Sequence, residues 1–520
     1  MVVDEVASLF FEDTMNLIHK KLSLLFLFTL MGFNLFGELE RPNVIIIYGD
    51  DIGYGDVSAY GSKMIQTPFI DNLSEKGLRF TDAHSPSSTC SPSRFSLLTG
   101  EYAFRKNIRI LGPKAPLIIP IDSFTLADLF KTADYKTCII GKWHLGLGLK
   151  NNPLDLNGRI EMGPLDLGFD YTFIIPSTND RVPCVYIENS KVVNLDPNDP
   201  ISVGVQKTQV DLNTTQYPDG KINRSAMTYY ESSHGHNHSV INGIGRIGYM
   251  SGGKSALWND EKMSDVFINK ALAFIEKNKN KPFFMFFSSQ DIHVPRTPHP
   301  RFHGATELGY RGDAMVQFDW TVGSIVGALK EHDLFQNTIV IITSDNGPAY
   351  DDGYVDGTTV KTSKSNNDRG HYAAGKFRGG KYTVYEGGNR VPLIIHWPKK
   401  ITPGISNALV SQIDFMSSFA SLLDIEIPEN LSKDSIDSLS ALLGDDFEGR
   451  SFLIEEAPRA IALRKRNWKY IDFYKKKNGQ KISELYDLKK DPAESLNLIN
   501  SYPIVAENLK RELESIKSSN

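Results

Sequence analysis

Residues 43–48 read NVIIIY and run directly into Gly49-Asp50-Asp51. An unbroken apolar stretch of this length, rich in β-branched residues, predicts a strand that is buried on both faces, as in a parallel sheet covered by helices. The same character recurs in four further stretches: KTCII (136–140), PFFMFFSS (282–289), TIVIITS (338–344) and VPLIIHW (391–397). Helical patterns fall between them, at 67–78, 123–133, 262–278 and 314–332. This alternation predicts an α/β, doubly wound fold.

The remainder of the chain predicts a second, smaller domain. After about residue 440 the pattern changes to antiparallel strands followed by a charged helix at 503–518. We therefore expect a main domain over 38–440 and a small α+β domain over 441–520. Two segments, roughly 150–260 and 348–375, are rich in Gly, Asn, Asp and Ser and are predicted to be long insertions. Loops of this length in compact domains are usually functional or disordered.

The N-terminal segment predicts export. Basic residues at 19–21 precede an apolar run over 22–36 and the small residue Gly37, which is the layout of a secretory signal peptide. The run is shorter than the roughly 20 residues of a transmembrane helix, which favours a cleaved signal over an uncleaved anchor. An acidic stretch precedes it, so Met15 is an alternative start. We expect a leader and signal peptide over 1–37, no stable membrane insertion after cleavage, and a periplasmic or extracellular mature protein.

Composition narrows the range of partners and folds. The 520 residues are 41% hydrophobic and 23% charged, as in ordinary globular proteins. The net charge of −5 and the lack of long blocks of one sign argue against nucleic acid as a partner. The three cysteines, Cys90, Cys138 and Cys184, are too few and odd in number for a disulfide framework.

Unusual polar residues follow four of the predicted strands. They are Asp50 and Asp51 after the first, Lys142 and His144 in GKWHLG after the second, His293 after the third, and Asp345 and Asn346 after the fourth. Ligands of open parallel sheets bind beyond the carboxyl ends of the strands, so these residues predict one site. The oxygen donors favour Ca²⁺ over Mg²⁺ and argue against zinc. The alternative is that the Asp and Asn residues serve only as turn residues or helix N-caps.

Several cations are candidates to surround an anionic group at this site. They are Arg94, Lys142 and Lys381, together with the imidazoles of His144 and His293. Arginine and lysine are charged donors suited to sulfate or phosphate oxygens. Taken singly, each also fits a solvated surface position, although the tryptophan and glycines of GKWHLG make that segment a poor generic loop.

Cys90 stands at the start of a predicted helix, one turn before Arg94. A thiol in that position is expected to have a lowered pKa and to be reactive. The alternative is a buried structural cysteine, which is the interpretation that Cys138 and Cys184 fit.

The stretch CSPSRFSLLTG (90–100) matches C-x-P-S-R-x-x-x-L-x-G, and on this motif the chain resembles the sulfatase family. The resemblance continues through PNVIIIYGDDIGYGD, GKWHLG, SDNGP, EGGNRVP and ELYDLKKDPAESLNL, in family order. It implies an alkaline-phosphatase-like fold, a mixed sheet flanked by helices, with a smaller C-terminal domain. It also implies that a maturation enzyme oxidises Cys90 to formylglycine, so that this residue is an aldehyde precursor rather than a thiol catalyst.

The resemblance further implies a set of roles. One Ca²⁺ per chain would be held by Asp50, Asp51, Asp345, Asn346 and the modified Cys90. One hydroxyl of the hydrated aldehyde, activated by Ca²⁺ and Asp345, would attack sulfur, and His144 would deprotonate the other to expel sulfate. Arg94 and Lys142 would hold the formylglycine hydroxyls and the metal side. Lys381 and His293 would bind sulfate, with His293 as the general acid.

The substrate implied is a sulfated glycan. Asp180 and Arg181, with His234, His236 and His238 of a histidine-rich stretch, resemble the sugar-contacting insertions of bacterial exo-acting 6-O-sulfatases that act on galactose or N-acetylgalactosamine. In that resemblance Asp180 and Arg181 would bind the axial hydroxyl. A histidine-rich loop is equally typical of flexible surface or adventitious metal binding. Two other functions stay open: a phosphonate or phosphodiester hydrolase of the same superfamily, and an unmodified, inactive glycan-binding protein.

Overall fold

The computed structural model describes residues 41–150, 154–350, 353–356, 370–477 and 480–519. The predicted leader, the signal peptide with cleavage after Gly37 and the alternative start at Met15 all lie outside the described residues. No helix in the described ranges has both the length and the apolar character needed to cross a membrane.

A ten-stranded mixed sheet forms the centre of the main domain, in the order β15-β2-β14-β13-β1-β12-β4-β5-β6-β7. Its strands are β1 (Asn43–Gly49), β2 (Leu78–Phe80), β4 (Lys136–Lys142), β5 (Tyr171–Ile175), β6 (Ile187–Glu188), β7 (Lys191–Val192), β12 (Phe283–Ser288), β13 (Thr338–Ser344), β14 (Leu393–His396) and β15 (Gly404–Ser406). The five stretches predicted as strands are therefore all confirmed.

Five neighbouring strands, β13, β1, β12, β4 and β5, run parallel. In their registers Ile46 pairs with Phe286 on one side and Ile341 on the other. Every residue of β1, β12 and β13 is buried, which explains why these segments are almost wholly apolar rather than alternating. Because the strands are parallel, the residues that follow β1, β4, β12 and β13 meet at one edge of the sheet, as predicted.

The last predicted strand, β14, differs from the parallel group because it pairs antiparallel with β13 and β2. The short helix α8 (Glu386–Asn389) precedes it, and Gly347 approaches this helix so closely that a Cβ on Gly347 would lie 1.8 Å from the carbonyl oxygen of Gly387. The chain therefore enters β14 from the carboxyl edge and runs away from it. This direction keeps the preceding segment, which contains Lys381, at that edge.

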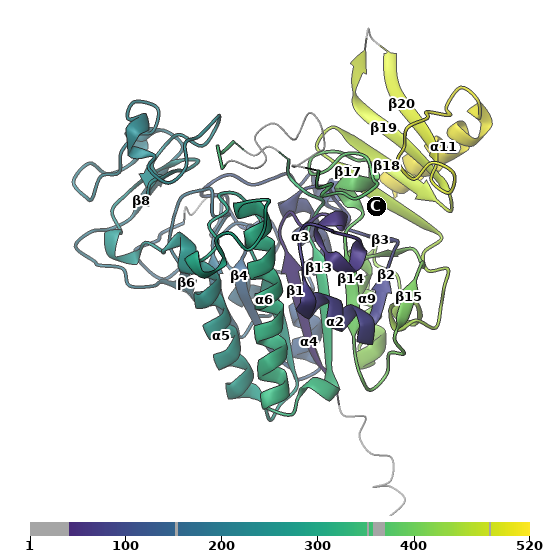
Figure 1. The fold of residues 1–520 in the computed structure, drawn as a ribbon, viewed down its shortest axis with the longest axis horizontal. Coiled ribbons are helices and arrows are strands. Elements are labelled where there is room, and N and C mark those ends of the chain that lie inside the picture. The colour runs from purple at the N-terminus through teal and green to yellow at the C-terminus, as the bar shows by residue number, and fades with distance from the viewer. Residues whose placement is uncertain (1–40, 151–153, 351–352, 357–369, 478–479, 520) are drawn as a thin grey trace, which may run out of the picture. The chain divides into compact units, whose positions relative to one another are not determined.

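Helices cover both faces of the sheet (Figure 1). In the view shown, α2 (Pro68–Lys76), α5 (Met263–Asn278) and α6 (Tyr310–Glu331) lie in front of it, and α4 (Leu126–Thr132) and α9 (Phe415–Leu423) lie behind it. α3 (Cys90–Thr99) packs against α4 and α9, and α10 (Leu439–Leu443) packs against α9. The four predicted helices are confirmed. The start of α4 shows why: Thr125 and Asp128 form a capping box, which satisfies backbone donors at the helix N-terminus.

The first predicted insertion is more regular than expected. Its TFII stretch lies in β5, which extends the parallel group, so the prediction of a long loop over the whole of 150–260 was wrong. The remainder forms short antiparallel pairs, β8 (Ser202–Gly204) with β11 (Tyr249–Ser251) and β9 (Val240–Ile241) with β10 (Ile244–Gly245). In the second insertion, 351–352 and 357–369 lie outside the described residues.

The C-terminal domain has an antiparallel sheet, as predicted. Its strands are β17 (Phe452–Ala457), β18 (Ala460–Lys465), β19 (Trp468–Lys477) and β20 (Gln480–Asp487), followed by α11 (Pro503–Ser518). Leu509 and Leu513 of α11 pack on Ile454 and Leu463 of the sheet, and Tyr102 joins this cluster from the main domain. Nearby, β3 (Ala83–His84) pairs with β16 (Val410–Ser411). The domain boundary at residue 440 stays a prediction.

Candidate active site

Three buried carboxyl groups meet at the carboxyl edge of the sheet. Asp50 and Asp51 follow β1, Asp345 follows β13, and one oxygen of each lies within 4.8 Å of the others. Consecutive residues of an extended chain point in opposite directions. Asp51 instead has a φ of 62°, in the left-handed region that non-glycine residues rarely adopt. This turn breaks the alternation and lets two consecutive carboxylates face the same space.

Three cationic side chains neutralise these acids. Arg94 donates from Nε and Nη2 to Oδ2 of Asp345 at 3.1 and 2.9 Å. The other pairs are Lys142 with Asp50, and Lys381 with Asp51 at 2.9 Å. Burial tends to raise the pKa of Asp50, but the charge of Lys142 outweighs it and holds that pKa below its usual range. Burial and the neighbouring Asp50 raise the pKa of Asp345 to about 7.

Asn346 has a buried oxygen that a cation bound at this cluster would explain. Its Nδ2 donates to Asp51 Oδ1 at 2.7 Å and to the carbonyl oxygen of Gly347 at 2.9 Å. Its Oδ1 is buried and has no hydrogen-bond partner among the described residues. A buried acceptor without a partner requires an explanation, and a bound cation beside three carboxylates provides one. The all-oxygen donor set fits the predicted Ca²⁺.

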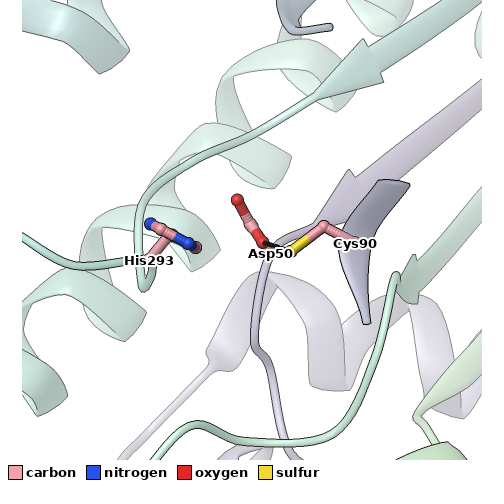
Figure 2. Close-up of side chains that lie close together, drawn as sticks. All are labelled: Asp50, Cys90 and His293. Atoms are coloured by element: carbon pink, nitrogen blue, oxygen red, sulfur yellow. Dashed lines mark hydrogen bonds between the residues drawn. The ribbon is translucent and has the colours of Figure 1, made fainter. Parts of the chain in front are cut away.

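Cys90 begins α3 and is buried beside this cluster. Its Sγ lies 3.9 Å from Asp50 Oδ1, and Figure 2 shows Cys90 and His293 on either side of Asp50. The predicted lowering of its pKa was wrong, because burial raises the pKa of the Cys90 thiol to about 12 despite Lys142 and Lys381. An unmodified thiol here would be a poor nucleophile at neutral pH, since the thiolate is the reactive form.

The two predicted histidines present one ring nitrogen each to the site. His144 Nε2 lies 3.0 Å from the carbonyl oxygen of Leu111 and therefore donates, whereas its Nδ1 is buried with no hydrogen-bond partner in the described ranges. His293 Nδ1 donates to the carbonyl oxygen of Val294 at 2.7 Å, and its Nε2 lies 4.0 Å from Asp51 Oδ2. Burial lowers the pKa of both rings, to about 4 for His293, so both are neutral at pH 7 before a ligand binds.

A cavity of about 90 Å³ opens at Cys90 and joins the predicted residues from distant parts of the chain. Its lining comprises Cys90, His144, His293, Lys381, Asp180, Arg181 and His236, which were named from the sequence, and Tyr382, Ile110 and Ile247, which were not. Four predicted residues are absent from this lining. Asp345 belongs to the acidic cluster, and the other three contact it: Arg94, Lys142 and Asn346.

The wall formed by Asp180 and Arg181 also contains His236. Asp180 is buried, and its Oδ2 lies 2.9 Å from His236 Nε2 while its Oδ1 accepts from Arg181 at 2.6 Å. Burial tends to raise the pKa of Asp180, but Arg181 holds it well below its usual value. The predicted His234 is exposed and is absent from the cavity lining. The alternating histidines of SSHGHNHSV gave no signal for choosing His236, since only the fold of this loop decides which ring turns inward.

Comparisons with known proteins agree with this geometry. The profile of the Sulfatase family matches residues 42–425, and that of the N-sulphoglucosamine sulphohydrolase C-terminal region matches residues 377–519. The chain is 45% identical to an N-acetylgalactosamine-6-O-sulfatase of Bacteroides thetaiotaomicron, over 92% of this chain and 94% of that protein. It is 28% identical to human arylsulfatase A, over 88% of this chain and 83% of that protein.

A solved structure leads to the same family. It is described as part of the metabolism of multiple glycosaminoglycans by Bacteroides thetaiotaomicron, and it superimposes with a TM-score of 0.86 at 44% identity, covering 92% of this chain and all of that one. The family profile, the close relative and the convergence of the motif residues at one cavity lead to one conclusion. The chain belongs to the sulfatase family and hydrolyses sulfate esters.

Proposed function

We propose that the protein is an exported, exo-acting sulfatase that removes the 6-O-sulfate from N-acetylgalactosamine or galactose at the end of a sulfated glycan. The observation that carries this proposal is the wall of Asp180, Arg181 and His236 in the same cavity as Cys90. A buried carboxylate and an arginine side by side suit a sugar hydroxyl that both accepts and donates hydrogen bonds. The 45% identity to an N-acetylgalactosamine-6-O-sulfatase supports the choice of sugar.

The metal in this proposal is one Ca²⁺, held by Asp50, Asp51, Asp345 and Asn346 together with the modified Cys90. In the described cluster three carboxylates face three cationic side chains, so the site is close to neutral without a metal. Bound Ca²⁺ would supply two further positive charges, which favour an anionic sulfate ester and its developing charge. The unpartnered Oδ1 of Asn346 supports this assignment.

We also propose that a maturation enzyme oxidises Cys90 to formylglycine. The CSPSR motif and the raised pKa of the thiol both support a modified residue, because the thiol itself would be largely protonated at neutral pH. Formylglycine supplies a hydrated aldehyde with two hydroxyls on one carbon, of which one can attack sulfur and the other can release sulfate afterwards.

The protein's own side chains then have distinct tasks. Lys381 binds the sulfate group, while Arg94 and Lys142 position the side chain at residue 90 and the acidic cluster. His144 accepts a proton at Nδ1, the atom that lacks a partner among the described residues. His293 protonates the leaving oxygen from Nε2, since an anionic ester bound next to this ring favours its charged form.

A substrate panel tests the sugar assignment. The Arg181→Ala variant should lose about a hundredfold in kcat/KM on 6-sulfated N-acetylgalactosamine, because a partly buried hydrogen-bonding partner of the sugar is removed. Turnover of a small aryl sulfate should be unchanged, since that substrate has no axial hydroxyl. Arg159→Ala, an exposed arginine of the same insertion, is the matched control. Equal loss on both substrates would contradict the sugar-binding role.

Mass spectrometry tests the modification of Cys90 and distinguishes an active sulfatase from an unmodified glycan-binding protein. Conversion of Cys90 to the aldehyde lowers the mass of its peptide by about 18 Da, whereas an unchanged thiol would favour an inactive glycan-binding protein. Competing assays on sulfate, phosphate and phosphonate esters should show a preference for sulfate. N-terminal sequencing of the mature protein tests export, with a start immediately after Gly37 as the expected result.

A further inference from the structure

A second cavity lies between α3 and the C-terminal domain, and we call it the C-terminal groove. It measures about 550 Å³, compared with about 90 Å³ for the cavity at Cys90. Its lining includes Thr89, Arg109, Ile110, Pro458, Tyr474 and Lys517. Ligand sites of drug-sized molecules usually measure about 300–1,000 Å³, so the cavity at Cys90 is too small for a sugar chain whereas the groove is large enough.

The groove adjoins the active site through shared chain segments. Ile110 lines both cavities, and Thr89 in the groove directly precedes Cys90 in the active site. The floor between them is held by backbone hydrogen bonds, in which Ser88 N donates to Glu456 O at 2.8 Å and Glu456 N donates to Pro86 O at 3.0 Å. A molecule that extended from the cavity at Cys90 past Ile110 would therefore reach the C-terminal groove.

The charges of the groove favour an anion. Arg109 and Lys517 are exposed, and Arg109 makes a long hydrogen bond of 3.5 Å to Asn107 Oδ1. The acid in the lining, Glu456, is buried, and burial raises its pKa to about 8, so it is largely neutral at pH 7. The groove thus presents two cations without a charged acid in its lining. Burial raises the pKa of Tyr474 to about 12, and Arg109 lies close enough to this phenol to oppose part of that rise.

Tyr474 gives the groove an aromatic surface. Its side chain is 51% exposed on β19, in the same lining as Arg109 and Lys517. Aromatic rings offer a large, rigid apolar face that suits the C–H face of a sugar ring, while the phenol oxygen stays available to water. A half-exposed tyrosine in the same lining as two cations is therefore a suitable place for an anionic sugar.

We propose that the C-terminal groove binds the sugar that follows the cleaved one in the glycan, and that this sugar carries a carboxylate or a sulfate. The proposal rests on the proposed function, since it extends the substrate from the same active site. Arg109 and Lys517 pair with the anionic group, and Tyr474 stacks on the ring. The preferred substrate is thus an anionic oligosaccharide rather than a single sulfated sugar.

The test compares two substrates that share the same scissile group. One is 6-sulfated N-acetylgalactosamine, and the other is a trisaccharide with this sugar at its non-reducing end followed by a uronate. A second trisaccharide, with a neutral sugar in place of the uronate, separates charge from stacking. The variants are Arg109→Ala and Lys517→Ala, with Lys106→Ala and Arg511→Ala as exposed controls on the neighbouring segments.

The wild-type enzyme should prefer the uronate trisaccharide to the monosaccharide. Each of the two groove variants should lose about tenfold in kcat/KM on that trisaccharide, as expected for one charge-assisted contact, and should match wild type on the monosaccharide. The control variants should match wild type on both substrates. Equal loss on both substrates, or an unchanged trisaccharide preference in both groove variants, would overturn the proposal.

Tyr474 provides an independent readout. Tyr474→Ala should weaken turnover of both trisaccharides, whereas Tyr474→Phe should retain it because the ring remains.

If the wild type desulfates no 6-sulfated sugar, the proposed function fails, and calorimetric binding of the desulfated uronate trisaccharide then tests the groove alone. Binding that Arg109→Ala weakens would support the groove, and binding that this variant leaves unchanged, or no binding at all, would overturn it.

Discussion

Two clusters of buried charges in this protein have similar composition and different roles. The first is the acidic cluster at Cys90. The second, which we call the docking cluster, joins the main domain to the C-terminal sheet and comprises Asp82, His84, Glu386, Arg390, Glu455, Arg464, Lys469 and Glu494. Ligand atoms of Asp82, His84 and Glu386 lie within 4.8 Å of one another, as do those of the active-site carboxylates.

The charges of the docking cluster are paired with one another, although Glu455 Oε2 and Glu494 Oε1 make ion pairs with Lys469 rather than hydrogen bonds. His84 has Asp82 Oδ1 and Glu455 Oε1 at 2.8 Å from its two ring nitrogens. Lys469 lies 2.9, 2.8 and 3.2 Å from Glu386, Glu455 and Glu494 respectively. Arginine side chains fill the remaining positions around Asp82 and Glu386, with distances of 2.6 Å from Arg464 to Asp82 and from Arg390 to Glu386.

The acidic cluster at Cys90 differs because it contains buried polar atoms without partners in the described part of the chain and lies beside an open cavity. Asn346 Oδ1 and His144 Nδ1 lack hydrogen-bond partners among the described residues, and an open cavity reaches Cys90. The comparison teaches that burial and charge alone do not identify a binding site. The distinguishing features are buried polar atoms that have neither a hydrogen bond nor an ion pair among the described residues, and space for a ligand, since paired charges stabilise a structure without binding anything further.

The largest expected effect comes from the active-site side chain itself. Cys90→Ala should lower kcat/KM on sulfate esters by about a thousandfold or more, because the proposed nucleophile is removed. The thermal midpoint should change little, since the side chain is small. Steady-state kinetics and a thermal scan check both expectations. Substantial remaining activity in this variant, prepared alongside the maturation enzyme, would refute the role of Cys90.

In the docking cluster, a substitution should reduce stability rather than catalysis. Lys469→Met leaves three buried carboxylates without their shared cation, which should reduce the free energy of unfolding by about 3–5 kcal/mol. Urea denaturation measures this loss. Lys490→Met removes an exposed lysine that pairs with Asp487, and should cost less than about 0.5 kcal/mol. Similar values for the two variants would show that the docking cluster contributes no special stability.

Metal removal should affect the active-site cluster alone. Saturating Ca²⁺ at about a hundred times its dissociation constant should stabilise the folded protein by about 2.7 kcal/mol and restore activity after chelation. Asn346→Ala should weaken this stabilisation, because one proposed ligand is lost. A titration of the thermal midpoint with Ca²⁺ checks both, and His84→Gln should leave the Ca²⁺ response unchanged. If His84→Gln rather than Asn346→Ala abolished the effect of Ca²⁺ on the thermal midpoint, the metal would lie in the docking cluster.

The smallest expected effect is a pH dependence of the docking cluster. Burial tends to lower the pKa of His84, but hydrogen bonds to Asp82 and Glu455 raise it above its ordinary value of 6.5. A raised pKa means that the folded protein keeps a proton that the unfolded chain has lost. The stabilisation is therefore complete below pH 6.5 and declines as the pH rises through the folded pKa, by at most about 1.4 kcal/mol per pH unit.

His84→Gln provides the measurement for this effect. The difference in the free energy of unfolding between wild type and variant should shrink as the pH rises from 6 to 9. A difference that stays constant, or that grows with pH, would show that His84 is neutral in the folded protein.

Local patterns in the sequence predicted much of the fold and most of the site. The apolar run of β1 predicted a buried strand, and the parallel arrangement of β1, β4, β12 and β13 brings the residues after them together as expected. The strand β5 was missed, because its short TFII run stands in a segment rich in turn residues. The pKa of Cys90 was predicted in the wrong direction, because the depth of burial is invisible in the sequence.

The sequence by itself therefore determined five strands of the central sheet, the family motif and the identities of the residues at Cys90. The strands follow from short apolar runs. The site residues follow from short motifs that stand directly after those runs. Only the tertiary structure decided that His236 rather than His234 enters the cavity, that Lys469 meets three glutamates and that a groove runs from Thr89 to Lys517. Each of these depends on contacts between residues far apart in the chain, and burial and charge pairing exist only once those residues have packed together.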